Sequence, residues 1–241
     1  MGQNDASRAC AVLVAGGMGQ RFGNPDGKQL VGLAGRPLIG WTLEAFDAAE
    51  CVGHIVVVCP HERELQIREE ILSCSTFSTP ITFAPSGAER QDSTRNGLAA
   101  VPEEFDVIAV HDGARPLILP ETIDAAINLL LGSTGLDGVV CGQPAVDTLK
   151  IVDEQGHFIE TPPRSRFWTV QTPQVFWVDS LRRAYAWVEE SGFVGTDDSS
   201  LVEGMGGVVL GFEAPRDNLK VTLPEDVPPV EGVLHARRSA L

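Results

Sequence analysis

The sequence predicts an α/β protein in which helices cover both faces of a largely parallel sheet, giving three layers, and a β-arm projects from that sheet. Two observations support this prediction. Up to Ala145, short β-branched runs alternate with segments of helical periodicity, an order that requires right-handed crossovers between parallel strands. After Ala145 the alternation stops, and a segment without a helical period follows before helices and strands resume.

The strands and helices follow one another in a regular order. The first strand is expected at 10–16, and the helix at 37–49 begins with Pro37, which suits a first helical turn. Thr222 and Glu225 are expected to form a capping box that opens the last helix. Further strands are predicted at 54–60, 81–85, 106–112, 137–145, 207–214 and 218–222, and further helices at 61–72, 89–101, 120–131 and 178–190.

Apolar residues that recur at helical spacing predict the buried face of each helix. Helix 178–190 carries one clear apolar stripe, whereas helix 61–72 mixes its apolar residues with many charges. The predicted buried positions are Ile39, Leu43 and Phe46 in the first helix, Leu65, Ile67, Ile71 and Leu72 in the second, and Leu181, Ala184, Tyr185 and Val188 in helix 178–190.

Residues 146–171 are predicted to leave the sheet as an arm. Segments 146–151 and 156–161 fit a hairpin around "DEQG". The arm is rich in apolar side chains, and the simplest cover for them is the same arm of a two-fold related copy. We therefore expect a single domain over 8–235, with 146–171 as the dimerisation arm of a homodimer. The apolar residues of the arm are Leu149, Ile151, Phe158, Ile159, Phe167 and Trp168.

Composition excludes several classes of partner. The 241 residues include 18 Lys and Arg against 33 Asp and Glu, and this net charge of −15 opposes binding to nucleic acid or to an anionic membrane. A small anionic substrate stays possible, because a few cations can create a local positive site. The 5 cysteines include no C-x-x-C pair, which favours buried thiols in a reducing compartment. No targeting segment or apolar run near the ~18 residues of a membrane span is present, so we expect a cytoplasmic protein.

A glycine-rich loop with two cations, "VAGGMGQRFGNPDGKQL", follows the first strand. Ligands of α/β sheets bind at the carboxyl ends of strands, where this loop is expected to lie. A dinucleotide fingerprint and a P-loop both need glycine at the position of Phe22, and a P-loop also needs Ser or Thr at Gln29. Two hypotheses are left. Either backbone N–H groups approach a phosphate ligand with Arg21 and Lys28 behind them, or the segment is a flexible turn with solvated charges.

The same segment resembles the nucleotide-binding signature of sugar-phosphate nucleotidyltransferases, most closely that of the 2-C-methyl-D-erythritol 4-phosphate cytidylyltransferase family. The resemblance continues in the family's order through "GAERQDSTRNGL", "VHDGARP", "PAVDTLK", "RFWTVQTPQVF", "GTDDSSLVE" and "DNLKVTLPED". It implies a Rossmann-like nucleotidyltransferase fold and a Mg²⁺-assisted reaction of non-mevalonate isoprenoid synthesis. In that reaction an alditol phosphate oxygen attacks the α-phosphorus of CTP and releases pyrophosphate. The chain departs from the family at Phe22, Gly27 and Gly113, where Met, Pro and Ala are usual.

The resemblance also implies roles for individual residues. Arg21 and Lys28 would bind the triphosphate and stabilise the five-coordinate transition state, while Asp112 and a second candidate, Asp217, would hold Mg²⁺. Nucleotide binding is implied for Ala15, Gly16, Gly17, Gly19, Arg90, Ser93 and Asp112. Positioning of the alditol phosphate is implied for Thr148, Arg164, Lys220, Arg115 and Thr172, with Thr148 and Arg164 reaching into the partner's pocket.

Alternatives stay open for several of these residues. Asp112 also suits an Asx-turn, Ser93 an ordinary first helical turn, and Thr196 either a helix N-cap or a ligand contact. Arg115 fits a surface cation before proline as well as a site wall. Packing suits His111 better than proton transfer, and a solvated helix start suits Asp197, Asp198 and Glu203.

Three other functions compete with this assignment. A ribitol 5-phosphate or related alditol-phosphate cytidylyltransferase shares most of the signature, although "VHDGARP" and "PAVDTLK" favour the methylerythritol substrate. A non-catalytic nucleotide-binding protein is disfavoured, because binding alone does not require both Arg21 and Lys28. An NAD-dependent dehydrogenase is opposed by the missing fingerprint glycine.

Overall fold

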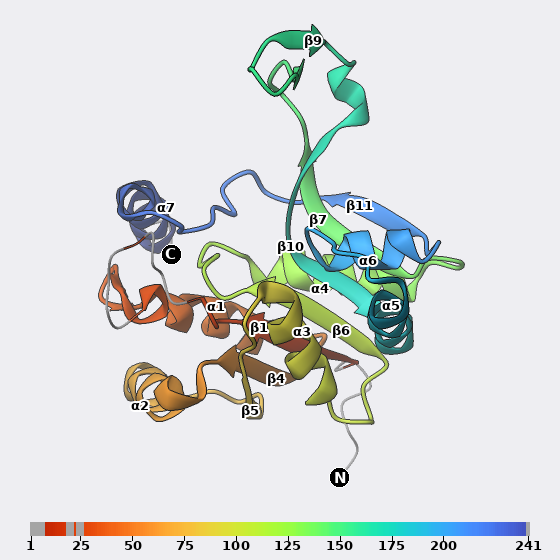
Figure 1. Ribbon diagram of the computed structural model, residues 1–241. Coiled ribbons are helices and arrows are strands. Elements are labelled where there is room, and N and C mark those ends of the chain that lie inside the picture. Colours follow the sequence, from red (N-terminus) through yellow and green to blue (C-terminus); the bar gives the residue numbers. More distant parts are fainter. Residues whose placement is uncertain (1–7, 18–21, 23–26, 240–241) are drawn as a thin grey trace.

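The computed structural model describes residues 8–17, 22 and 27–239. Its centre is a seven-stranded sheet with the order β11-β7-β10-β6-β1-β4-β5 (Figure 1). All of these strands point the same way except β10, which runs against its neighbours β6 and β7. The predicted, mostly parallel sheet is therefore confirmed. Its strands are β1 (Ala9–Val14), β4 (Val52–Cys59), β5 (Ile81–Pro85), β6 (Val107–Asp112), β7 (Gly138–Pro144), β10 (Trp168–Trp177) and β11 (Val209–Glu213).

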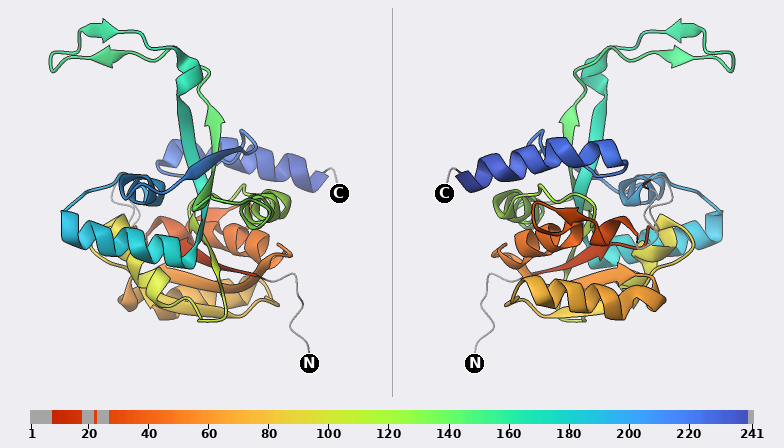
Figure 2. Two further views of the ribbon diagram at one scale, coloured as in Figure 1. Left: turned by 90° about the vertical axis from the view of Figure 1, so that its right-hand side faces the viewer. Right: turned by 90° about the vertical axis from the view of Figure 1, so that its left-hand side faces the viewer.

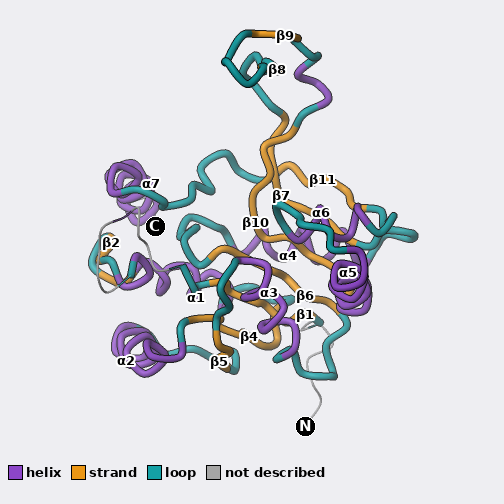
Figure 3. The backbone as a smooth tube through the Cα atoms, in the orientation of Figure 1, coloured by secondary structure: helices purple, strands orange, loops and turns teal. Residues whose placement is uncertain are grey.

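Helices cover both faces of the sheet (Figure 3), and side chains of β1 alternate between the two faces. Ala11 and Leu13 pack in the cluster that includes α1, α2 and α4, whereas Cys10 and Val12 pack with α3, α5 and α6. The helices are α1 (Leu38–Asp47), α2 (Glu64–Cys74, preceded by η3, His61–Arg63), α3 (Arg90–Ala99), α4 (Pro120–Leu131), α5 (Val178–Ser191) and α6 (Asp198–Gly204). Among the described helices, none has the length and apolar character needed to cross a bilayer.

A smaller apolar cluster joins the last helix, α7 (Val227–Ser239), to the beginning of the chain. Leu33 and Leu38 pack there with Leu117 and with Leu234 of α7. Val221 is fully buried in the same cluster, which anchors the loop before α7 beside the loop after β6. The short elements of this region are η2 (Lys28–Leu30), β2 (Gly32–Leu33), β3 (Arg36–Pro37) and η5 (Pro224–Asp226).

The predicted arm stands away from the body of the molecule (Figure 2). It consists of a short antiparallel hairpin of β8 (Ile151–Val152) and β9 (Phe158–Glu160), followed by η4 (Arg164–Arg166). Phe158 is 72% exposed and Ile159 is 65% exposed. The projecting β-arm is thereby confirmed, while its role in dimerisation stays a prediction.

Four local predictions are wrong. Residues 218–222 form a loop instead of a strand, because Asn218 and Lys220 reach polar partners on β10 and β6 while Val221 packs into the apolar cluster at α7. Residues 168–177 form strand β10 of the sheet. No strand was predicted there, and residues 168–171 were assigned to the arm. Leu65 and Leu72 are exposed, since α2 turns only Ile67 and Ile71 inward. The backbone N–H groups of Thr222 and Leu223 are capped by Asp226 and not by Glu225.

Candidate active site

A cleft of about 920 Å³ opens where the parallel strands β1, β4 and β5 end. Gly16 and Ser86 bring its two glycine-rich walls together, and a Cβ on Gly16 would clash with Ser86. The cleft narrows inward to a part of about 310 Å³ that reaches Asp112. Its lining includes Gly16, Gly17, Lys28, Ser86, Gly87, Arg90, Ser93, Asp112 and Lys220.

The predicted nucleotide loop lies partly in this cleft. Gly16 and Gly17 line it, whereas Gly19 and Arg21 lie outside the described residues. The Ala15 N–H donates to the carbonyl of Val58 at 2.8 Å, so Ala15 fastens the loop to β4. At the far end of the loop, Gly27 has φ +78°, a conformation that glycine adopts and proline cannot. A proline at this position would need a different backbone conformation.

Lys28 and Ser93 both line the narrow part of the cleft. Lys28 donates from Nζ to the Val221 carbonyl at 3.1 Å, so its ammonium group is bonded to the loop before α7. Ser93, in the first turn of α3, is buried and accepts a hydrogen bond from the Gly87 N–H at 3.0 Å. Ser93 therefore shapes the glycine-rich wall from inside.

Asp112, the last residue of β6, is surrounded by cations. Its Oδ2 atom lies 2.7 Å from Lys220 Nζ and 3.5 Å from Arg115 Nε, and its Oδ1 atom lies 3.3 Å from Arg90 Nε. Burial raises the pKa of Asp112, but Lys220 and Arg90 lower it more, so this pKa stays well below its ordinary value. The carboxylate is ionised at neutral pH. We call Arg90, Asp112, Arg115 and Lys220 the charged wall.

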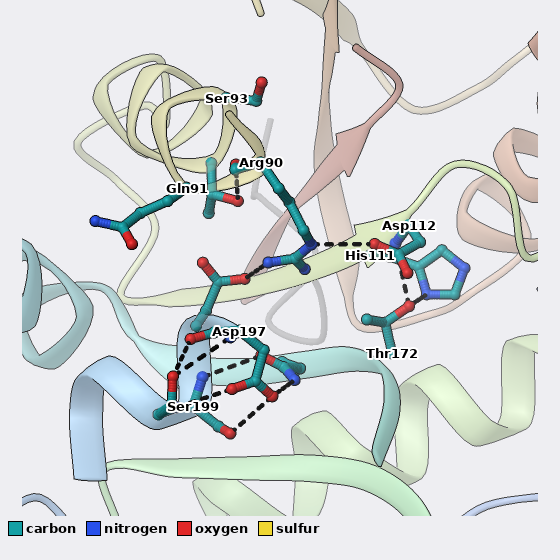
Figure 4. A network of polar contacts seen from close by, with 12 residues as sticks. Arg90, Gln91, Ser93, His111, Asp112, Thr172, Asp197 and Ser199 are labelled. Atoms are coloured by element: carbon teal, nitrogen blue, oxygen red, sulfur yellow. Dashed lines mark hydrogen bonds and ion pairs between the residues drawn. The ribbon is translucent and has the colours of Figure 1, made fainter. Parts of the chain in front are cut away.

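Arg90 belongs to a second ion pair on its other side (Figure 4). Arg90 Nη1 lies 2.7 Å from Oδ2 of Asp198, whose other oxygen accepts from the Tyr185 hydroxyl at 2.8 Å. Burial disfavours the charged guanidinium, but Asp198 and Asp112 outweigh it and raise the pKa of Arg90. The prediction that Asp198 is solvated is wrong, because its side chain is only 1% exposed.

Asp197 also differs from the solvated residue that was predicted. Its carboxylate accepts from the Ser200 N–H at 3.0 Å and so caps α6. The amide of Gln174, a buried residue of β10, donates to the same carboxylate at 2.6 Å. Glu203 is exposed, as predicted.

His111 and Thr172 support the charged wall from the sheet (Figure 4). Thr172 Oγ1 accepts from the Asp112 N–H at 3.1 Å and lies 3.0 Å from His111 Nδ1. His111 Nε2 faces the Arg115 carbonyl at 3.4 Å, and because a carbonyl only accepts, the neutral ring is assigned its proton on Nε2 and accepts the Thr172 hydroxyl proton at Nδ1. Burial lowers the pKa of His111 to about 3, so the ring is neutral. These contacts agree with the predicted packing role.

A second cleft of about 510 Å³ lies on the other side of the charged wall. The wall residues line it together with Trp168, Thr172, Gln174 and Thr196. Arg115 donates to the Asn218 carbonyl at 2.9 Å and is mostly buried. Arg90, Asp112 and Lys220 thus border both clefts, so two ligands would meet across them.

Other predicted residues lie elsewhere. Thr148 and Arg164 are exposed on the arm, and Arg164 donates to the Val146 carbonyl at 2.7 Å. Asp217 pairs with Arg237 of α7 at 2.8 Å. Within the part of the chain that the structure describes, no group of three or more His, Cys, Asp or Glu side chains gathers as a metal site.

The sequence analysis missed the pair of Asp198 and Tyr185 as part of the site. A signal for Asp198 exists in the sequence, because Leu201 and Val202 follow at helical spacing and both are buried. That spacing places Asp198 on the inward face of α6. Nothing local indicates that its partner is Arg90.

The chain is similar to known proteins over nearly its whole length. The family model for 2-C-methyl-D-erythritol 4-phosphate cytidylyltransferase matches residues 9–236. Similar proteins of that name occur in Caldanaerobacter subterraneus (37% identity, 90% of this chain and 94% of the relative) and Parasynechococcus marenigrum (40%, 94% and 98%). A crystal structure from Anaerococcus prevotii, named 4-diphosphocytidyl-2C-methyl-D-erythritol synthase, has a TM-score of 0.83 at 26% identity over 96% of this chain and 97% of its own. The Thermus thermophilus cytidylyltransferase has a TM-score of 0.74 at 28% identity over 93% and 98%.

Proposed function

This chain belongs to the 2-C-methyl-D-erythritol 4-phosphate cytidylyltransferase family, and we propose that it transfers CMP from CTP to 2-C-methyl-D-erythritol 4-phosphate. The products are 4-diphosphocytidyl-2-C-methyl-D-erythritol and pyrophosphate, in non-mevalonate isoprenoid biosynthesis. The observation that carries the proposal is the charged wall shared by two clefts. The names of the relatives favour the methylerythritol substrate over ribitol 5-phosphate.

In this mechanism the triphosphate occupies the glycine-walled cleft and the alditol phosphate the second cleft. A phosphate oxygen of the alditol phosphate forms a bond to the α-phosphorus of CTP, and the bond from that phosphorus to the bridging oxygen breaks. Pyrophosphate leaves with the electron pair. The nucleophile is already an anion, so no protein base is required, and neutral His111 is not used as one. Catalysis rests on positioning and charge stabilisation.

Each predicted residue has a proposed role in that reaction. Arg21 and Lys28 stabilise charge that develops on the triphosphate. The loop from Ala15 through Gly16, Gly17 and Gly19 brings backbone groups to the nucleotide, together with Arg90 and Ser93. Lys220, Arg115 and Thr172 position the alditol phosphate from the second cleft.

Mg²⁺ is the proposed cofactor. Asp112 is a hard oxygen donor at the meeting point of the two clefts, and Mg²⁺ commonly takes one carboxylate plus substrate phosphate oxygens. The residues therefore fit an ion held chiefly by the triphosphate. When bound, the ion neutralises phosphate charge. Asp217 is a second candidate ligand, and it would first have to release Arg237.

We also propose that the enzyme works as a homodimer. The single domain over 8–235 would pair through its arm at 146–171, and Thr148 and Arg164 would contact the alditol phosphate in the partner's site. The exposed apolar residues of the arm support this proposal. Buried free thiols at Cys10, Cys51, Cys59 and Cys141 support a reducing, cytoplasmic location.

The test is incubation with CTP and Mg²⁺ and a panel of alditol phosphates, with pyrophosphate release and product mass measured. We expect kcat/KM for 2-C-methyl-D-erythritol 4-phosphate to be well above that for ribitol 5-phosphate. A higher value with ribitol 5-phosphate would assign the alternative activity. CTP binding without pyrophosphate release from any member would leave a nucleotide-binding protein.

A further inference from the structure

Arg90 is held by two carboxylates from distant parts of the chain, and the two contacts are unequal. Arg90 Nη1 lies 2.7 Å from Asp198 Oδ2, whereas Arg90 Nε lies 3.3 Å from Asp112 Oδ1. The shorter contact is made outside the charged wall. Because short, charge-assisted hydrogen bonds are the strong ones, Asp198 is the main anchor of the guanidinium.

The carboxylate of Asp198 does not cap its own helix. The N-terminus of α6 is already capped by Asp197, which accepts from Ser200. Asp198 is instead turned inward, is 1% exposed, and divides its two oxygens between Arg90 and the Tyr185 hydroxyl. A buried carboxylate is costly unless it is paired, and Arg90 and the Tyr185 hydroxyl supply one partner for each of its oxygens.

We propose that Asp198, held by Tyr185, is a positioning residue for nucleotidyl transfer that acts through Arg90. Arg90 borders both clefts, and Asp198 fixes it there. Because the Arg90 guanidinium is shared between Asp198 and Asp112, it does not move fully onto Asp112. Oδ2 of Asp112 therefore stays paired with Lys220. Without Asp198, the guanidinium is released to follow Asp112 or the triphosphate. This inference rests on the proposed cytidylyltransferase activity.

The first experiment compares kcat and KM for CTP in Asp198→Asn, Tyr185→Phe and the wild-type protein. Loss of a partner that orients a metal-binding side chain commonly costs about 10- to 100-fold in activity, and we expect a loss of the same order for an oriented guanidinium. We expect kcat/KM to fall by about that factor in Asp198→Asn and by a few-fold in Tyr185→Phe. The matched control is Asp137→Asn. Asp137 accepts from Ser180 in the first turn of α5 at 2.6 Å and lines neither cleft, so kcat/KM should not change.

A double-mutant cycle with Arg90→Ala then separates positioning from general destabilisation. If Asp198 acts through Arg90, Asp198→Asn lowers kcat/KM in the wild-type background but causes no further loss in the Arg90→Ala background. Equal losses in both backgrounds, or an unaffected Asp198→Asn enzyme, would overturn the inference. Thermal unfolding of each variant shows which are folded. A wild-type protein that is inactive with CTP and 2-C-methyl-D-erythritol 4-phosphate would instead contradict the proposed function, so the two failures are distinguishable.

Discussion

The charged wall and the arm differ in how their side chains are partnered. In the wall, Asp112 is 11% exposed at its side chain and is matched by cations from α3, from the loop after β6 and from the loop before α7. On the arm, Phe158 and Ile159 lie exposed on a hairpin that stands off from the body. The wall is thus organised by its own chain before any ligand arrives. The arm, in contrast, exposes apolar side chains that its own chain does not cover.

The largest effect is expected in the glycine-walled cleft beside the charged wall, where the triphosphate is proposed to bind. Lys28→Ala should reduce kcat by about two to three orders of magnitude, because a donor aimed at developing phosphate charge is lost. Arg21→Ala is expected to act similarly. Steady-state pyrophosphate release measures the loss, with the exposed Arg68→Ala on α2 as the control cation. A near-normal kcat for Lys28→Ala would remove it from the proposed transition-state contacts.

The next effect tests whether the arm completes a partner's site. Lys28→Ala and Arg164→Ala, each inactive, are mixed under conditions that exchange subunits. If Arg164 serves the opposite site, a mixed dimer places both defects in one site and none in the other. Random exchange makes half of the dimers mixed, so activity should return to about a quarter of the wild-type level. No return of activity, with exchange proven by mass spectrometry, would mean that each site is built within one chain.

The positions of the two clefts follow from regularities that a sequence displays. The glycine loop and "VHDGARP" each end a β-branched run, and parallel strands bring their carboxyl ends to one edge. Gly16, Lys28 and Asp112 were expected together for that reason, and the structure brings them together. The resemblance added roles for Lys220 and Arg115, which the structure places in the same wall.

The parts that were missed depend on long-range packing. Arg90 and Asp198 are 108 residues apart, and only the packing of α6 beside α3 and α5 joins them. β10 was missed because Gln171, Thr172 and Gln174 interrupt its apolar alternation, and these polar residues face partners in the site. The polarity of this segment is therefore typical of a loop, although in the fold it is the strand whose side chains support the site.

A third prediction concerns the stability of the pre-organised wall at low pH. Burial lowers the pKa of His111 to about 3, whereas an unfolded histidine titrates near 6.5. Between these values the unfolded chain binds the extra proton, so the free energy of unfolding should fall as pH drops from about 6.5, by at most about 1.4 kcal/mol per pH unit. Urea unfolding from pH 7 to pH 5 measures this slope. His111→Gln should reduce this slope. His54→Gln, at a less buried site, should reduce the slope less. Equal slopes in the wild type and both variants would contradict the prediction.

The smallest effect is expected at Asp217, which lies between the wall and α7. Its carboxylate is 41% exposed and pairs with Arg237, so Asp217→Asn should cost no more than about 1 kcal/mol in the free energy of unfolding. If Asp217 serves this contact and not the metal, the Mg²⁺ concentration for half-maximal activity is unchanged in Asp217→Asn and raised in Asp112→Asn. Arg237→Gln is the control for the Mg²⁺ requirement, because it removes the same ion pair from the other side; its loss of stability should be larger, since Arg237 also donates to the Leu117 carbonyl at 2.9 Å. A higher Mg²⁺ requirement in Asp217→Asn, absent from Arg237→Gln, would show instead that Asp217 leaves its partner to bind the ion.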